Sequence, residues 1–200
     1  MKKIDIILSL ITGAGIAGLI IWLLRNSQIQ IALPYSIVFL IIIFPIVSLA
    51  CLWIAYLIGK KFIFVFQLAK FILIGALFAI FDLSILNVLM DYFGITAGTA
   101  YMIFVAVSFI ITTSVKYVAD KFWAFEKTEK EQMGMEFGKF FIITVISGGI
   151  QVIIASLIVN VIGPQFGLLP LVWANIGKIG GIIIASVWNF ICYKFIVFKK

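Results

Sequence analysis

Six stretches of apolar residues follow one another along the chain, separated by short polar connections. They cover residues 4–24, 33–58, 71–90, 100–118, 140–162 and 169–193. Each is long enough, at roughly 20 residues, to cross the hydrocarbon core of a bilayer. None alternates between apolar and polar residues as the strands of an outer-membrane barrel do. The pattern therefore predicts an all-α, polytopic membrane protein with six transmembrane helices.

Composition supports the same class of protein. Hydrophobic residues make up 64% of the 200 residues and charged residues only 12%, which is more apolar surface than a soluble globule of this size can bury. Tryptophan and tyrosine tend to fall near the ends of the predicted helices, as at Trp22, Tyr92 and Trp123. That placement is typical of the aromatic belts at the two membrane interfaces.

The basic residues lie at alternate connections. Twelve of the fifteen are in the amino terminus, the second and fourth connections and the tail. We expect the protein to lie in the cytoplasmic (inner) membrane. The positive-inside rule predicts that both termini and the 121–139 connection lie on its cytoplasmic side. The net charge of +7 then attracts anionic lipid headgroups. Because these lysines form no separate basic domain, we expect no nucleic-acid partner.

Residues that carry common enzyme chemistry are scarce. The chain has no histidine, which excludes imidazole metal sites and histidine-based triads. Cys51 and Cys192 stand singly in different predicted helices and are interpreted as small apolar residues. The sequence contains no HExxH motif and no glycine-rich phosphate loop. We therefore expect no catalytic residue, no metal, no cofactor and no enzymatic activity.

The last four predicted helices form an internal duplication. The stretch FQLAKFILIG at 66–75 recurs as MEFGKFFIIT at 135–144, and KFWAFEK at 121–127 recurs as KFIVFKK at 194–200. Each copy is a two-helix hairpin that begins and ends on the same side, so the repeats are parallel. The predicted organisation is an amino-terminal hairpin over 1–60 and a four-helix domain over 61–200, with repeats at about 66–127 and 135–200.

Polar residues occupy corresponding positions in the two repeats. The matched pairs are Lys70 with Lys139, Asp82 with Gln151, Lys116 with Asn189, and Lys121 with Lys194.

Lys178 is the only charged residue between Pro170 and Cys192, inside a predicted span. At 1.5 Å per residue, it lies about 12 Å from the outer end of its helix, while Asp82 lies about 17 Å and Gln151 about 18 Å from the cytoplasmic ends of theirs. In a core of about 30 Å these three residues share one level. An unpaired charge there is costly, so we expect Lys178 to face Asp82 inside the bundle. Asn175 falls on approximately the same helical face as Lys178.

The region 66–200 resembles the GtrA-like family. The resemblance rests on the Lys-Phe entries of the two hairpins ("AKF" and "GKF"), the acidic Asp82 near the middle of its helix, and the ending KYVADKFWAFEK at 116–127. Members of that family are small four-helix membrane proteins of cell-surface polysaccharide glycosylation. They are thought to move a polyprenyl-phosphate-linked sugar between leaflets. The amino-terminal hairpin and Lys178 depart from the family pattern.

The resemblance implies a substrate-binding role for two groups of residues. The polyprenyl phosphate would meet ammonium groups at the cytoplasmic surface. These belong to Lys70, Lys116, Lys121, Lys139 and Lys194, with Asn189 as the counterpart of Lys116. The sugar and phosphate would then pass residues near the middle of the membrane. These are Asp82, Gln151, Asn175 and Lys178.

Several alternatives stay open. Asp82 and Lys178 could serve only to hold helix register. A proton-coupled exporter of the small multidrug resistance type would use Asp82 as a shared proton and cation site. A non-transporting scaffold would dock a membrane glycosyltransferase through the basic cytoplasmic face. The expected partners are the sugar lipid and membrane lipids, with a glycosyltransferase and a second copy of the chain as further candidates.

Overall fold

The computed structural model describes residues 1–26, 34–126 and 133–197. Every element of secondary structure in these residues is a helix. The six long helices are α1 (Lys3–Asn26), α2 (Pro34–Gly59), α3 (Ile63–Phe93), α4 (Gly98–Ala119), α5 (Met133–Ser156) and α6 (Pro170–Cys192). All six contain a segment long and apolar enough to cross a membrane. The predicted all-α fold with six transmembrane helices is therefore confirmed.

Three helices continue into π-helical turns. These are η1 (Asp120–Ala124) after α4, η2 (Leu157–Ile162) after α5 and η3 (Tyr193–Val197) after α6. Wider turns of this kind occur frequently at functional sites. Here η1 and η3 carry Lys121 and Lys194, which occupy corresponding positions in the two predicted repeats.

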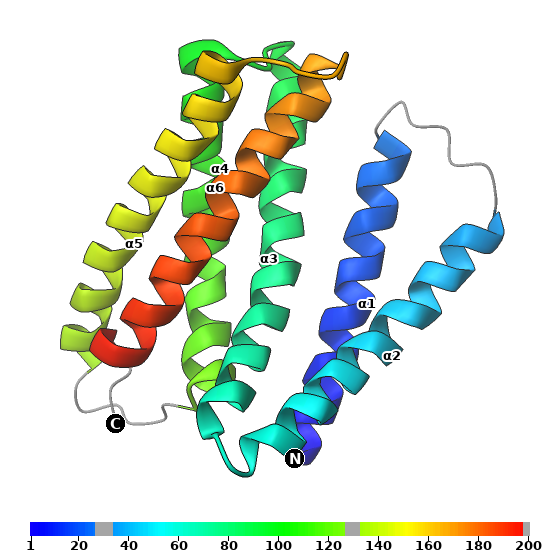
Figure 1. Cartoon of the computed structure of the whole chain (residues 1–200), viewed down its shortest axis with the longest axis vertical. Helices are drawn as coiled ribbons and strands as arrows, with labels where there is room; N and C mark the ends of the chain where they lie inside the picture. The colour runs from blue at the N-terminus through cyan, green and yellow to red at the C-terminus, as the bar shows by residue number, and fades with distance from the viewer. Residues whose placement is uncertain (27–33, 127–132, 198–200) are drawn as a thin grey trace.

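Helices α3 to α6 form a bundle, and the hairpin of α1 and α2 packs beside it on α3 (Figure 1). The hairpin lies close to α3 near the end that holds both chain termini and diverges from it toward the other end. Helix α3 begins at Ile63, eight residues before the start of the predicted span, and includes Lys70. Lys70 is therefore buried within α3 rather than placed before the helix. It forms ion pairs there with Asp5 and Glu126.

The bundle contains two apolar clusters separated by a polar layer. One cluster includes Phe71, Phe140 and Phe190, and the other includes Leu86, Ala155 and Ala174. Asp82 of α3, Gln151 of α5 and Lys178 of α6 lie between these positions, and all three are almost fully buried. The two clusters thus hold a layer of polar groups at a fixed level in the bundle.

Helix α6 lies at close range to α5 and its continuation η2 because α6 presents glycines to both. A Cβ atom at Gly177 would lie 2.5 Å from Val159 Cγ2, and one at Gly181 would lie 2.7 Å from the Gln151 carbonyl oxygen. Small residues spaced four apart allow such approach in membrane helices. The contact at Gly181 brings the backbone of Gln151 directly against α6.

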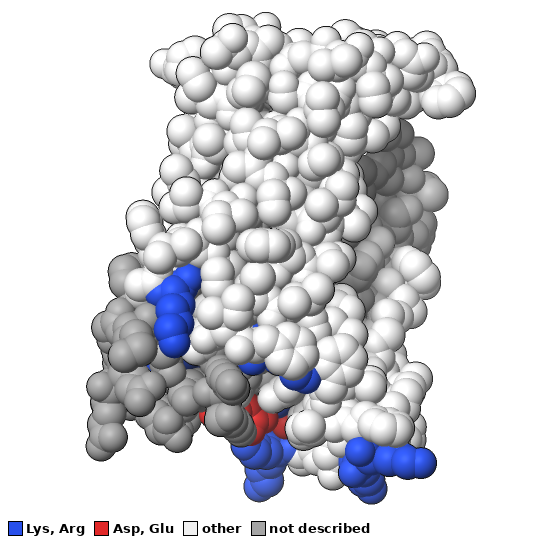
Figure 2. Space-filling view, turned by 60° about the vertical axis from the view of Figure 1, so that its left-hand side comes forward, with Lys and Arg blue, Asp and Glu red and all other residues white. Residues whose placement is uncertain are grey.

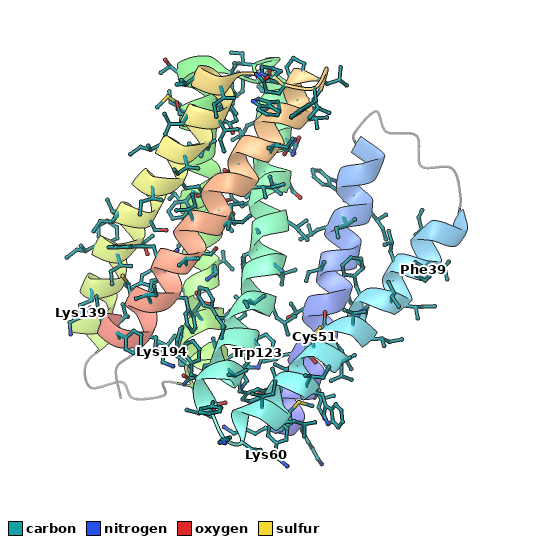
Figure 3. The ribbon with its side chains drawn as sticks, viewed as in Figure 1. Phe39, Cys51, Lys60, Trp123, Lys139 and Lys194 are labelled. Carbon is teal, nitrogen blue, oxygen red and sulfur yellow. The ribbon has the colours of Figure 1, made fainter. Side chains whose placement is uncertain are left out.

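Charged side chains gather at the end of the molecule that holds both termini. In the face shown in Figure 2, blue and red groups lie toward that end, and the described surface above them is uncharged. Lys60, Lys139 and Lys194 all lie there (Figure 3). We call it the lysine-bearing end.

Candidate functional site

A buried ion pair lies at the centre of the polar layer. Lys178 Nζ is 3.0 Å from Asp82 Oδ1, and the two side chains are 0% and 5% exposed. The predicted pairing of these residues is confirmed. Nζ also donates hydrogen bonds to the Val105 carbonyl oxygen at 3.1 Å and to Ser108 Oγ at 3.0 Å. One ion pair and two hydrogen bonds thus hold the ammonium group inside the bundle.

Gln151 joins the pair from α5. Its Nε2 donates to Asp82 Oδ2 at 3.3 Å, so both carboxylate oxygens are engaged. Asp82 and Gln151 hold corresponding positions in the two predicted repeats, and their direct contact is what a pseudo-symmetry axis between the repeats would produce. The sequence estimate that Gln151 lies at the same level is confirmed.

A groove leads from the lysine-bearing half of the bundle to Asp82. It has about 50 Å³ of water-accessible space between α3, α4, α5 and α6. Its polar lining consists of Asp82, Thr112, Thr113, Lys116, Gln151, Ser186 and Asn189. Four predicted binding residues, Asp82, Lys116, Gln151 and Asn189, are thereby brought to one cavity.

Several polar atoms that line this groove lack a partner within the protein. Gln151 Oε1, Thr112 Oγ1 and Asn189 Oδ1 are buried and make no hydrogen bond among the described residues. A buried polar group without a partner is costly. Three such atoms around one cavity therefore indicate a site suited to water or to a ligand rich in hydroxyl groups.

Lys116 supplies the positive charge of the groove. It forms an ion pair with Asp120 one turn further along the chain, and its Nζ lies 4.3 Å from the centre of the Phe71 ring. Asp120 itself is fully buried. The aromatic ring and the carboxylate together hold the ammonium group in a defined position at the groove lining.

Asn175 lies on the other side of the ion pair. It exchanges two hydrogen bonds with Asn87 of α3, at 2.8 and 3.0 Å between the amide groups. Both residues are nearer than Asp82 and Lys178 to the end opposite the lysines. Asn175 is therefore near the predicted level but belongs to an α3–α6 contact, and it does not line the groove.

Lys70 belongs to a separate cluster of charges where the hairpin meets the bundle. Its Nζ is 2.7 Å from Asp5 Oδ1 and 2.7 Å from Glu126 Oε1. Asp5 also accepts a hydrogen bond from Trp123 Nε1 at 3.1 Å. Lys70 and Asp5 are each 1% exposed. This lysine therefore ties the hairpin to the bundle, and its charge is balanced by two carboxylates.

Glu126 connects this cluster to the amino terminus through Lys2, whose Nζ is 2.5 Å from Glu126 Oε2. Partial burial acts to raise the pKa of Glu126, but hydrogen bonds from Lys2 and Lys70 outweigh it and hold that pKa below its ordinary value. The hydrogen bond and charge of Glu126 raise the pKa of Lys2 in turn. Nothing in the sequence pattern had singled out Glu126.

The remaining predicted lysines do not form one continuous site. Lys121 is 1% exposed, whereas Lys139 is exposed at the lysine-bearing end of α5 (Figure 3). Lys194 is half-buried, with Nζ 4.1 Å from the centre of the Phe64 ring. Among the lysines predicted to meet the phosphate at the cytoplasmic surface, Lys139 and Lys194 are therefore more accessible than Lys70 and Lys121.

Sequence reasoning missed Asp5, Asp120 and Glu126 as partners of the lysines. Each acidic residue lies near a lysine-rich helix end, where a solvated position is the ordinary interpretation. The spacing of Lys116 and Asp120 by four residues was the one local signal that could have revealed a contact. The partners of Lys70 are 65 and 56 positions away, so no local spacing indicates them.

No group of three or more His, Cys, Asp or Glu side chains suited to hold a metal occurs among the residues that the structure describes. Comparison with known proteins gives one family. The family model described as "GtrA/DPMS, transmembrane domain" matches residues 70–198. No curated protein and no solved structure matches the chain.

Proposed function

Because the chain belongs to the GtrA/DPMS transmembrane-domain family, we propose that it moves a polyprenyl-phosphate-linked sugar across the cytoplasmic membrane for cell-surface polysaccharide glycosylation. The substrate would keep all its covalent bonds, so the proposed activity needs no catalytic residue. Family membership supports a membrane role in handling lipid-linked sugars. The groove is the observation that supports translocation of the sugar head.

The groove combines the two kinds of group that a phosphorylated sugar requires. Lys116 offers a point charge for the phosphate. Asn189, near the lysine-bearing end of α6, and Thr112 and Gln151 deeper in offer neutral polar atoms that have no partner within the described protein. In this conformation the groove has about 50 Å³ of water-accessible space, enough for a few water molecules, so the sugar head would enter it only as the surrounding helices move apart. The prenyl chain would remain in lipid, so only the polar head needs the groove.

The orientation that we propose places the lysine-bearing end in the cytoplasm. Lys60, Lys139 and Lys194 lie at that end, and the excess of basic residues in short connections favours the cytoplasmic side. The substrate would then approach Lys139 and Lys194 at the surface and reach Lys116 at the groove.

Reconstitution tests this proposal directly. Purified protein in vesicles should transfer a radiolabelled polyprenyl-phosphate glucose from one leaflet to the other, measured by its accessibility to a membrane-impermeant oxidant. Thr112→Val and Asn189→Leu should each reduce the rate at least tenfold. Ser114→Ala is the matched control on α4, because Ser114 is exposed away from the groove, and it should transport at the wild-type rate.

The double variant Asp82→Leu with Lys178→Met separates transport from helix register. Removing a whole buried pair is often tolerated, so this variant should insert and remain folded but lose transport. Wild-type transport in the double variant would assign the pair to register alone. The scaffold would be favoured instead if the wild-type protein transferred no sugar lipid in vesicles and a glycosyltransferase copurified with it.

A further inference from the structure

A second and larger cavity lies where the amino-terminal hairpin meets the bundle. It has about 450 Å³ of water-accessible space, lined by residues of α1, α2 and α3 together with Lys60 and Glu126. That volume falls in the range of about 300–1,000 Å³ that is usual for small-molecule sites. Lys60 places the cavity at the lysine-bearing end, at the connection from α2 to α3 (Figure 3). No step of the proposed sugar-lipid transport uses it.

The lining of this cavity carries a surplus of positive charge. Lys70 pairs with Asp5 and Glu126, and Lys2 also pairs with Glu126. Lys60 is exposed and forms no ion pair with any residue that the structure describes. Three lysines therefore face two carboxylates in the lining. The positive charge that remains is that of Lys60.

The start of α3 adds a second attraction for anions. Its first residue, Ile63, lines the cavity, as does Gln67 one turn further on. The N-cap residue Phe62 makes no side-chain hydrogen bond to the first turn. The end of α2 lies beside it, but the Ile58 carbonyl group there already accepts hydrogen bonds from the Lys61 and Phe62 amides, both at 3.1 Å. Free amide groups at a helix start carry partial positive charge, so a phosphate oxygen is favoured there.

The cavity lies at the level where lipid headgroups meet the protein. The membrane-spanning segments of α1, α2 and α3 begin or end at Lys3, Gly59 and Ile63 respectively. Part of the lining is apolar, with the Tyr56 and Phe66 rings packed edge to face at 5.5 Å between centres. Ile63 is 65% exposed, so the apolar wall continues onto the outer surface of the helices. A free phosphate ion gains nothing from such a wall, whereas the hydrocarbon chains of a phospholipid can pack against it.

We propose that this cavity binds the phosphate group of an anionic phospholipid from the leaflet at the lysine-bearing end, with Lys60 and the first turn of α3 as its contacts. The bound lipid touches the hairpin and the bundle at once, so it strengthens the junction that Lys70 makes with Asp5. The site is separate from the groove beside Asp82, and its occupation does not depend on the proposed transport.

Native mass spectrometry of the full chain in detergent micelles tests the site, with dioleoyl-phosphatidylglycerol as the probe. Wild-type protein should retain one molecule of it that dioleoyl-phosphatidylcholine, whose headgroup is neutral overall, does not displace at equal concentration. Lys60→Gln should raise the Kd of the retained lipid about tenfold, as expected for the loss of one charge-assisted hydrogen bond.

Lys61→Gln is the matched control. It removes the same charge from the neighbouring residue, which is also exposed but is not part of the cavity lining, and it should change the Kd less than about twofold. Equal weakening in Lys60→Gln and Lys61→Gln would show a general attraction to the basic surface and would overturn the site.

Ile63→Glu tests the start of α3 without removing a lysine. A carboxylate in the first turn stabilises a helix, so the melting temperature without lipid should not fall, while the added charge repels the phosphate and should raise the Kd at least about tenfold. Unchanged lipid binding in a folded Ile63→Glu would overturn the proposed contacts. The comparison of Lys60→Gln with Lys61→Gln decides even if Ile63→Glu does not fold.

Two competitors identify the source of the phosphate. Neither inorganic phosphate nor farnesyl-phosphate glucose, each at the concentration of the probe, should displace the retained phosphatidylglycerol. Displacement by inorganic phosphate would overturn the assignment to a lipid. Displacement by farnesyl-phosphate glucose would assign the cavity to the sugar lipid and would overturn the separate phospholipid site, while leaving the proposed function intact.

Discussion

Lys70 and Lys139 occupy corresponding positions in the two predicted repeats but have different surroundings. Lys70 is 1% exposed between Asp5 and Glu126, and its Nζ lies 4.4 Å from the centre of the Phe66 ring. Lys139 is exposed. Two lysines at corresponding positions of the predicted repeats therefore differ in surroundings, because the hairpin of α1 and α2 contacts only the first of them.

We expect Lys70→Gln to lower the free energy of unfolding by about 3–5 kcal/mol, because it leaves the Asp5 carboxylate buried without its cation. Lys139→Gln should change that free energy by no more than about 0.5 kcal/mol, as is usual for a surface position. Unfolding in mixed micelles, followed by circular dichroism, measures both. Equal stabilities of the two variants would contradict the role of Lys70 as the link between hairpin and bundle.

At the scale of elements, the contact between α5 and α6 positions the groove. Gln151 reaches Asp82 from α5 only because Gly181 allows the backbone of α5 to lie against α6. The pair of α1 and α2 shows the same device, since a Cβ atom at Gly13 would lie 2.6 Å from Pro45 Cα. Close helix contacts therefore depend on single glycines in both parts of the molecule.

Gly181→Ala should destabilise the protein by about 1–3 kcal/mol, because its methyl group requires α5 and α6 to separate. Gly149→Ala is the control on α5. A Cβ atom there meets nothing within 4 Å, and alanine in a helix is favoured over glycine by roughly 0.5–1 kcal/mol. Thermal unfolding of the two variants should shift in opposite directions. Wild-type stability in Gly181→Ala would show that the helices are less closely packed than the structure has them.

At the scale of the whole molecule, charge and polarity divide the protein along its long axis. One end holds both termini and the clusters around Lys70 and Lys116. The other end holds the connections from Phe93 to Gly98 and from Ile162 to Pro170. The groove extends from the lysine-bearing half to the middle of the bundle, as its lining from Lys116 and Asn189 to Asp82 shows.

Cysteine labelling tests how this axis lies in the membrane. In a variant with Cys51 and Cys192 replaced by serine, single cysteines at Thr96 and Gln165 should react with an impermeant maleimide added to intact cells. A cysteine at Lys60 should react only after the cells are permeabilised, because the lysine-bearing end faces the cytoplasm. The reverse pattern would invert the orientation and the proposed direction of substrate entry.

The sequence alone determined the features that depend on composition and on distance along a helix. Apolar length determined six spans, and the rise per residue placed Asp82, Gln151 and Lys178 at one level. The cost of an isolated charge in the bilayer then predicted the Asp82–Lys178 pair, since few polar partners exist at that depth. The family resemblance followed from short stretches that belong to helix ends.

Only the tertiary structure decided which side of each helix faces which neighbour. In a membrane, helix surfaces that face lipid and surfaces that face protein are both apolar, so hydrophobic periodicity does not distinguish them. The position of Asp82 in the groove with Lys178 behind it, the Asn87–Asn175 contact and the capture of Lys70 by Asp5 all depend on this packing. Each joins residues far apart in the chain, and it is the rotation of whole helices against one another that brings them together.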